Sequence, residues 1–238
     1  DEQALKQALN VVDLCLRIGQ EGYLVVWTPY ALLALGARPS VQATAEEEQL
    51  QLQEQETFYQ RWLPRIARDP AFNVNLSLQG VGATSFSLEP GLRTGWSAFS
   101  RAQLPNVLAV PINASAIGHY RMSQPLIELE AANRAEGRIC YGLPSIIDIE
   151  RQSPDVIVLQ GRYSQSAIDE IPPLKKFCHA RRIFELDDYV IDVPHRNAHI
   201  RNMPNKQEME RMVRSAISLC DRVVVSTQPL ANALSDMH

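Results

Sequence analysis

The residues best suited to chemistry lie in five short polar segments, each of which follows an apolar run in the second half of the 238-residue chain. The segments combine hydroxyls, aromatic rings, arginines and carboxylates, on Gly118, His119, Tyr120, Arg121, Arg162, Tyr163, Ser164, Asp187, Asp188, Ser226 and Thr227. Carboxylates accept hydrogen bonds from sugar hydroxyls, and arginines pair with phosphate. The mixture therefore predicts a site for a polyhydroxylated or phosphorylated ligand.

A metal site is the weaker interpretation of the acidic segment. Asp187 and Asp188 are neighbours, so on a regular strand their side chains would face opposite sides and could not share one ion. His195 and His199 are four residues apart, which suits a metal only on a helix, and Pro194 argues against a helix there. We therefore expect no metal and no cofactor. A metal-dependent enzyme that uses these four side chains stays an alternative.

Nucleophilic and nucleotide-binding motifs are absent from the sequence. The four cysteines have no CxxC spacing, which argues against a zinc ribbon or a disulfide framework and indicates reduced thiols. Cys140, Cys178 and Cys220 fall on apolar faces, which predicts core positions rather than nucleophiles. The chain holds no GxSxG, no GxGxxG and no GxxxxGK[ST].

A scaffold for the polar segments is predicted by apolar runs that alternate with helical stretches. Strands are expected at 106–112, 138–143, 155–161, 181–188 and 222–227, and helices at 125–137, 144–152, 164–180, 205–221 and from 228. The alternation predicts a parallel sheet covered on both faces, a Rossmann-like α/β fold. Such sheets bind ligands outside the carboxyl ends of their strands, where the candidate residues would gather.

The first 105 residues show a different pattern. We expect a helix over 5–22 that Gly22 closes, a strand over 23–30, a second helix within 43–70 and an irregular segment over 71–96. The sequence thus predicts two regions. A helical and irregular region covers 1–105, and the α/β region covers 106–238.

Charge and hydropathy narrow the partners and the location. The net charge of -4 offers no broad basic field, so we expect no nucleic-acid partner. No apolar run approaches the roughly 18 residues of a transmembrane helix, and the opening DEQALKQALN does not resemble a signal peptide. We therefore expect a cytoplasmic protein, and leave peripheral membrane association open.

The stretch "ALNVVDLCLRIGQEGYLVVWTPYALL" resembles the last part of the catalytic domain of inverting, family-2-like GT-A glycosyltransferases, as does the wording of residues 69–88. In that family an Asn-Asp pair opens the helix, and its Asp is the catalytic base. Here Asn10 is followed by Val11, which cannot take a proton. "LLALGARPS" also lacks the His and Glu that usually follow "TPYA". The resemblance implies a degenerate remnant in which Asp13 and Arg17 are structural.

The segments "GHYRMSQPLIELEA", "PDVIVLQ", "FELDDYVIDVP" and "LCDRVVVSTQPLANAL" resemble the N-terminal half of retaining, family-4-like GT-B glycosyltransferases, which build bacterial surface polysaccharides. The resemblance implies an acceptor-binding Rossmann half. The loop 118–121 would approach the donor phosphate or the acceptor, and Asp187 and Asp188 would line the acceptor side. A C-terminal half that binds the nucleotide-sugar is expected beyond His238.

The two resemblances together imply a glycosyltransferase fragment, of hexosyltransferase type when intact and inactive alone. It would serve transfer of a sugar from a nucleotide-sugar to a glycan or lipid-linked acceptor. Such an enzyme needs no metal, because arginine, lysine and helix N-termini offset the charge of the leaving diphosphate. A non-catalytic glycan-binding or scaffold module stays the alternative.

Overall fold

Two compact units make up the chain, Asp1–Ile66 and Ala67–His238. The computed structural model describes residues 5, 9–26, 28–32, 44–73, 75–76, 78, 104–193 and 204–237. None of the helices in these ranges combines the length and the apolar character that a membrane crossing requires.

The first unit is built from two helices, α1 (Asn10–Gln20) and α2 (Ala45–Ala67), both close to their predicted positions. Phe58 and Trp62 of α2 form the buried centre of a small core together with Leu5. The partly buried residues around this centre are Leu9, Leu16, Tyr59 and Ile66. The core is small, so a few buried contacts between α1 and α2 define this unit.

The strand predicted over 23–30 does not form. Within the described residues 23–26 and 28–32 the backbone pairs with no strand, and Tyr23, Leu24 and Val26 are exposed. A strand needs a neighbour for its N–H and C=O groups, and β-branched or aromatic composition cannot replace that neighbour. The sequence prediction was wrong because it scored composition without a pairing partner.

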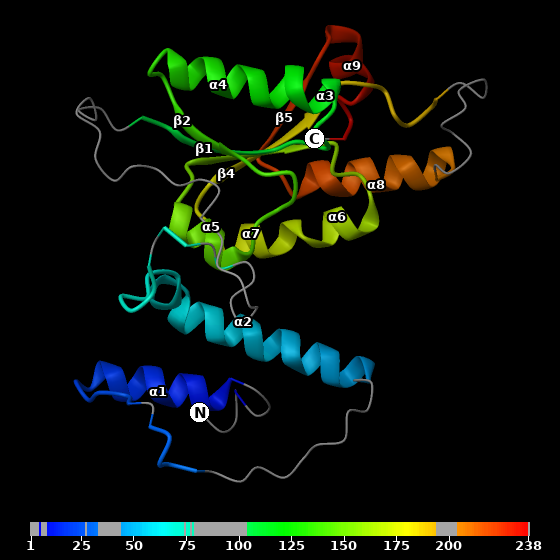
Figure 1. The fold of residues 1–238 in the computed structure, drawn as a ribbon. Helices are drawn as coiled ribbons and strands as arrows, with labels where there is room; N and C mark the ends of the chain where they lie inside the picture. Colours follow the sequence, from blue (N-terminus) through cyan, green and yellow to red (C-terminus); the bar gives the residue numbers. More distant parts are fainter. Residues whose placement is uncertain are drawn as a thin grey trace. The chain divides into compact units, whose positions relative to one another are not determined.

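The second unit contains the predicted parallel sheet. Its five strands are all parallel, in the order β2-β1-β3-β4-β5. Their bounds are β1 Asn106–Val110, β2 Glu136–Ile139, β3 Val156–Gln160, β4 Arg181–Leu186 and β5 Arg222–Val225. The Rossmann-like α/β fold predicted from the sequence is confirmed (Figure 1).

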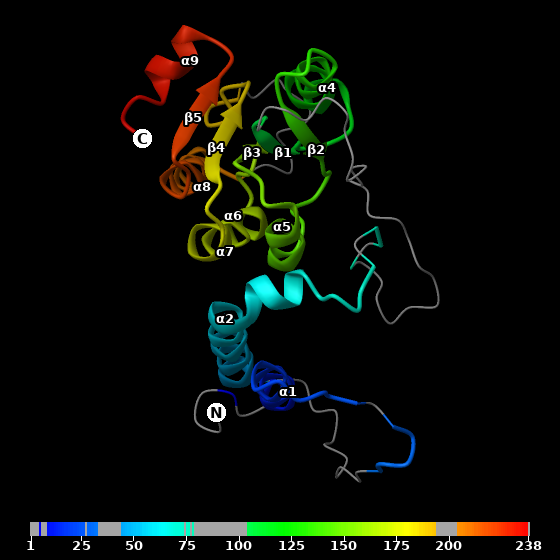
Figure 2. The ribbon, with the colours of Figure 1, turned by 90° about the vertical axis from the view of Figure 1, so that its left-hand side faces the viewer.

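Helices cover both faces of the sheet (Figures 1 and 2). One face packs against α5 (Ile146–Gln152), α6 (Gln165–Asp169), α7 (Ile171–Phe177) and α8 (Lys206–Ser218), through Leu108, Ile157, Leu159, Phe184 and Leu186. The other face packs Ala109 and Val158 against Met122 and Leu126 of the helical segment that runs from 116 to 131. The last helix, α9 (Gln228–Ala233), contacts β5.

Gly137 does not end a helix, although the helix predicted over 125–137 ends at this residue. Helix α4 (Gln124–Ala131) ends six residues earlier, where Asn133 adopts a positive φ of 53°, and Gly137 lies inside β2. A Cβ at Gly137 would stand 2.4 Å from Cδ1 of Leu126. The glycine therefore lets α4 approach the sheet closely, and the turn at Asn133 ends the helix.

The helical stretch predicted over 164–180 is interrupted just before Pro172-Pro173. Helix α6 ends at Asp169, and the two prolines fall in the first turn of α7, where their missing N–H groups cost no helical hydrogen bond. Ser164 caps α6 by accepting a hydrogen bond from the amide of Ala167 at 3.3 Å. This connection brings the chain back to the amino end of β4.

Candidate functional site

The candidate residues gather at the carboxyl edge of the sheet. They follow β1, β3, β4 and β5, whose last residues are Val110, Gln160, Leu186 and Val225. Strand order reverses at β1, which neighbours β2 on one side and β3 on the other. The crevice outside the carboxyl ends at such a reversal is where open α/β sheets bind ligands.

A π-helical turn, η1 (His119–Ser123), carries three of the predicted site residues. It joins α3 (Ala116–Gly118) to α4 without a break. Pro125 lacks the N–H that would bond to the carbonyl of residue 121 in a regular α-helix, so a local widening is favoured at this point. Such turns occur frequently at functional sites.

Gly118 is a packing residue of this turn. It is buried, and a Cβ at its position would stand 1.9 Å from the carbonyl oxygen of Asn113 and 3.1 Å from Cβ of Pro111. No other residue could bring the helix so close to the loop after β1. The structure therefore gives Gly118 a role in placing the neighbouring side chains.

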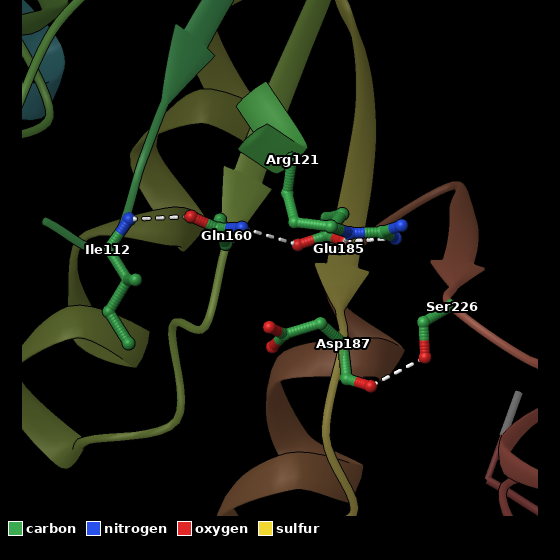
Figure 3. A network of polar contacts seen from close by, with 6 residues as sticks. All are labelled: Ile112, Arg121, Gln160, Glu185, Asp187 and Ser226. Atoms are coloured by element: carbon green, nitrogen blue, oxygen red, sulfur yellow. Dashed lines mark hydrogen bonds and ion pairs between the residues drawn. The ribbon is translucent and has the colours of Figure 1, made fainter. Parts of the chain in front are cut away.

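Arg121 is held by a buried carboxylate that the sequence analysis did not select. Its Nε and Nη2 donate to Oε1 of Glu185, at 2.8 and 2.5 Å. The other carboxylate oxygen accepts from Nε2 of Gln160 at 2.9 Å, and Oε1 of Gln160 accepts from the amide of Ile112 at 3.1 Å (Figure 3). One network therefore ties together the ends of β1, β3 and β4 and the π-helical turn.

The network changes the role expected for Arg121. Glu185 balances its charge, so the guanidinium is a weaker phosphate ligand than a free arginine would be. Gln160 and Glu185 are opposite one another in the β3–β4 register and are both buried. A polar residue that ends an otherwise apolar strand was the available sequence signal, because a buried polar group requires a partner.

His119 and Tyr120 are exposed at the same turn. Their rings meet edge to face, with centroids 5.1 Å apart. Exposed aromatic faces can stack on a sugar ring or a base. These two residues therefore remain candidates for ligand contact.

Asp187 and Asp188 follow β4 directly, and their surroundings differ from those of Glu185. Asp187 is half-buried and Asp188 is exposed, and neither carboxylate makes a hydrogen bond or ion pair with the described parts of the chain. The carboxylate of Asp187 points away from Ser226, whose hydroxyl donates to the backbone carbonyl of Asp187 at 2.6 Å (Figure 3). Two carboxylates thus keep their acceptor capacity for a ligand.

Tyr163 supplies a hydroxyl beside these acids. Burial raises the pKa of Tyr163, and the negative charges of Asp187 and Asp188 raise it further. The phenol therefore stays protonated at neutral pH and can donate a hydrogen bond. Arg162, its neighbour, pairs with Glu170 at 3.3 Å, and its buried Nη2 has no hydrogen-bond partner in the part of the chain that the structure describes.

Ser226 and Thr227 are both used by the backbone around them. Besides the bond from Ser226 to Asp187, the hydroxyl of Thr227 caps α9 by accepting from the amide of Leu230 at 3.4 Å. Both residues are exposed. They hold the loop after β5 against the loop after β4, and so support Asp187 rather than replace it.

Three of the cysteines lie at the core, as predicted. Cys140, Cys178 and Cys220 are partly buried and pack against the apolar core beside α5 and α7. Burial raises the pKa of the Cys178 thiol, and raises that of Cys220 to about 12. Neither thiol forms the thiolate that a nucleophile requires.

The alternative of a metal site at Asp187, Asp188, His195 and His199 can be compared with the structure only in part. His195 and His199 lie outside the described residues. In the ranges that the structure does describe, no three His, Cys, Asp or Glu side chains are placed to hold a metal ion.

In the first unit, Asp13 is completely buried between the two helices. Its Oδ2 accepts from Nε of Arg17 and its Oδ1 from Nε1 of Trp62, both at 2.9 Å, and Arg61 lies 3.5 Å away. Burial alone would raise the pKa of Asp13, but the hydrogen bonds from Trp62 and Arg17 and the charge of Arg17 hold it below its usual range. A carboxylate that is fully buried and bonded to both helices joins them and is withdrawn from solvent.

Similarity to known proteins is limited to one part of the chain. A stretch of 81 residues, 33% of the chain, is 35% identical to the uncharacterized protein y4gI of Sinorhizobium fredii (strain NBRC 101917 / NGR234). The stretch spans only 9% of that protein, so the chain is similar to a small part of a much longer polypeptide. No family model matches the chain, and no solved structure does.

Proposed function

We propose that residues 106–238 are the acceptor-binding half of a GT-B glycosyltransferase, which transfers a sugar from a nucleotide-sugar to a glycan or a lipid-linked acceptor during surface-polysaccharide synthesis. The observation that carries the proposal is the pair Asp187 and Asp188. These carboxylates have no partner among the described residues and stand beside the protonated hydroxyl of Tyr163, at the ligand-binding edge of a parallel sheet.

Sugar hydroxyls suit this arrangement. Each sugar hydroxyl can donate to a carboxylate of Asp187 or Asp188 and accept from the phenol of Tyr163. The exposed rings of His119 and Tyr120 offer an apolar face for the C–H side of a sugar. The resemblance of the four segments around these residues to GT-B enzymes selects glycosyl transfer among the activities that a sugar site could serve.

The transfer needs a donor-binding half in addition to these residues. The acceptor oxygen forms a bond to the anomeric carbon of the donor, and the bond from that carbon to the diphosphate breaks. The diphosphate leaves with the electron pair and takes up the hydroxyl proton. The residues of this chain would hold the acceptor oxygen within reach of the anomeric carbon.

Binding to the 238-residue chain tests the acceptor site directly. Saturation-transfer NMR with a panel of monosaccharides and oligosaccharides should detect at least one ligand. The double variant Asp187→Asn/Asp188→Asn should weaken that ligand at least about tenfold, because neutral amides replace charge-assisted acceptors.

A matched control removes two acids elsewhere on the same unit, Glu128→Gln/Asp169→Asn, both of which are exposed. It should bind the glycan like the wild type. No saccharide ligand, or an equal loss in both double variants, would contradict the acceptor site. Glycan binding without sugar transfer when the chain is combined with a nucleotide-sugar and a donor-binding half would favour the non-catalytic glycan-binding module.

A further inference from the structure

The amino edge of the sheet, opposite the site described above, carries a groove of 580 Å³. It opens where the loops from α7 and α8 enter β4 and β5. Its lining residues are Cys178, His179, Ala180, Arg181, Arg182, Asp221 and Arg222. Three arginines against one aspartate give the lining an excess of positive charge, in a protein whose overall net charge is -4.

Among the three arginines, Asp221 forms its hydrogen bonds with Arg182, and it also feels the charge of Arg181. Its Oδ2 accepts from the amide of Arg182 and its Oδ1 from Nη2 of the same residue, both at 2.7 Å. Burial alone would raise the pKa of Asp221, but the amide and guanidinium of Arg182 hold it below its usual range. Asp221 is therefore ionised at neutral pH and bonded to Arg182.

Arg181 and Arg222 remain without an acceptor within the described ranges. Arg222 is opposite Ile183 in the β4–β5 register, and Arg181 precedes Ile183 by two residues. Side chains two apart on a strand point to the same face, so Arg181 and Arg222 leave the sheet on the same side. Both residues line the groove, which places two arginines without a partner among the described residues at one site.

Nearby acids are engaged elsewhere. The carboxylate of Asp155 accepts from the amide of Asn106 at 2.7 Å, and the carboxylate of Glu150 pairs with Arg68 at 2.9 Å. On the other side, Lys175 and Lys176 lie in the last turn of α7, close to the start of the groove. The two lysines add positive charge near the groove, and the carboxylates of Asp155 and Glu150 keep negative charge there.

Arg182 forms the inner wall of the groove. Its side chain is only 10% exposed, and its Nη2 donates to Asp221. The groove therefore contains an inner arginine paired with Asp221 and two outer arginines without an acceptor among the described residues.

We propose that this groove binds a phosphate-bearing anion, with Arg181 and Arg222 as its direct ligands and Arg182 at its inner wall. Guanidinium groups donate pairs of parallel N–H bonds that match phosphate oxygens. The alternative is a purely structural role, in which the arginines offset the partial negative charge of the carbonyl groups at the C-terminal ends of α7 and α8. That alternative requires no ligand, and so the two differ in a binding experiment.

Isothermal titration of the 238-residue chain with inorganic pyrophosphate at low ionic strength tests the proposal. The double variant Arg181→Gln/Arg222→Gln should weaken binding at least tenfold. The control Arg134→Gln/Arg211→Gln removes the same two charges from exposed positions outside the groove, and should stay within twofold of the wild type. Circular dichroism and thermal unfolding of each variant establish that it is folded.

Vesicles of phosphatidylcholine with about one-third phosphatidylglycerol identify the source of the phosphate, in a sedimentation assay with the same variants. Binding of vesicles but not of pyrophosphate, lost in Arg181→Gln/Arg222→Gln alone, assigns the groove to a lipid headgroup. Pyrophosphate binding without vesicle binding assigns it to a soluble phosphate. Binding of neither probe, or equal losses in both double variants, overturns the proposal. Neither result depends on the glycan titration at the opposite edge.

Discussion

Each compact unit contains a buried carboxylate that accepts hydrogen bonds from an arginine and from a neutral N–H donor. In the first unit Asp13, with no exposed side-chain surface, accepts from Arg17 and Trp62. In the second unit Glu185, only 4% exposed, accepts from Arg121 and Gln160. The chemistry is similar, but the positions differ: Asp13 joins two helices, whereas Glu185 lies at the ligand-binding edge of the sheet.

The arginines and the neutral donors differ in whether water can replace the carboxylate when it is removed. Arg17 and Arg61 are 49% and 37% exposed, so water can take over their hydrogen bonds. Gln160 is 1% exposed and also holds the amide of Ile112, so its N–H has no such alternative. The neutral donors, Trp62 and Gln160, are buried in both units, and the arginines are partly exposed in both. The two carboxylates therefore differ mainly in what they join, two helices in the first unit and three strand ends with the π-helical turn in the second.

The largest effect is expected from Glu185→Ala. The substitution leaves Arg121 and Gln160 without their acceptor inside the sheet, and should lower the free energy of unfolding of the second unit by about 3–4 kcal/mol. Hydrogen exchange followed by mass spectrometry reports each unit separately. Peptides from β3 and β4 should lose more than about 100-fold in protection, while peptides from α1 and α2 stay unchanged.

The variant Glu185→Gln separates charge from packing. It keeps the shape and an acceptor for Gln160, so most of the protection in β3 should return. If Glu185→Gln and Glu185→Ala lose the same protection in β3, the ion pair with Arg121 provides the stability and the hydrogen bond from Gln160 contributes none. If neither variant changes the exchange of β3, the proposed network does not stabilise the sheet.

Much of the second unit was predictable, because its signals are local. Apolar runs of four to six residues between helical stretches predicted the parallel sheet, and the chain order of polar segments predicted their common edge. The Arg121–Glu185 pair was not predictable in the same way, since it joins residues 64 apart in the sequence. It depends on the π-helical turn and on the β3–β4 register, and neither can be derived from composition.

A smaller effect is expected from Asp13→Ala. Two exposed arginines can be hydrated, so the main loss is the buried N–H of Trp62 and the contact that joins α1 to α2. We expect about 2–3 kcal/mol of destabilisation in the first unit. Hydrogen exchange should show weaker protection in α1 and α2, with no change in β3 and β4. Equal losses in both units would mean that the comparison of two separate carboxylates is wrong.

The failed strand at 23–30 and the buried Asp13 show the limits of sequence reasoning in the first unit. The resemblance implied a structural role for Asp13, and the contact with Trp62 gives that role its physical content. The strand depended on a pairing partner that none of the described residues provides. Helices carry their own hydrogen bonds and could be predicted one at a time, whereas a strand could not.

The smallest effect is expected from acid. Asp13 has a folded-state pKa below its ordinary value of 3.8, so the folded state binds fewer protons than the unfolded state between these two values. Its contribution is fully present above the unfolded pKa and is lost as the pH falls through the folded pKa. Urea unfolding of the wild type and of Asp13→Asn, followed by circular dichroism between pH 6 and pH 2.5, isolates this contribution. The stability difference between the two proteins should be constant near pH 6 and shrink below about pH 4, because only the wild type can gain a proton at this position. A difference that stays constant down to pH 2.5 would mean that hydrogen bonding to Trp62, which an amide oxygen can also accept, carries the whole contribution of Asp13.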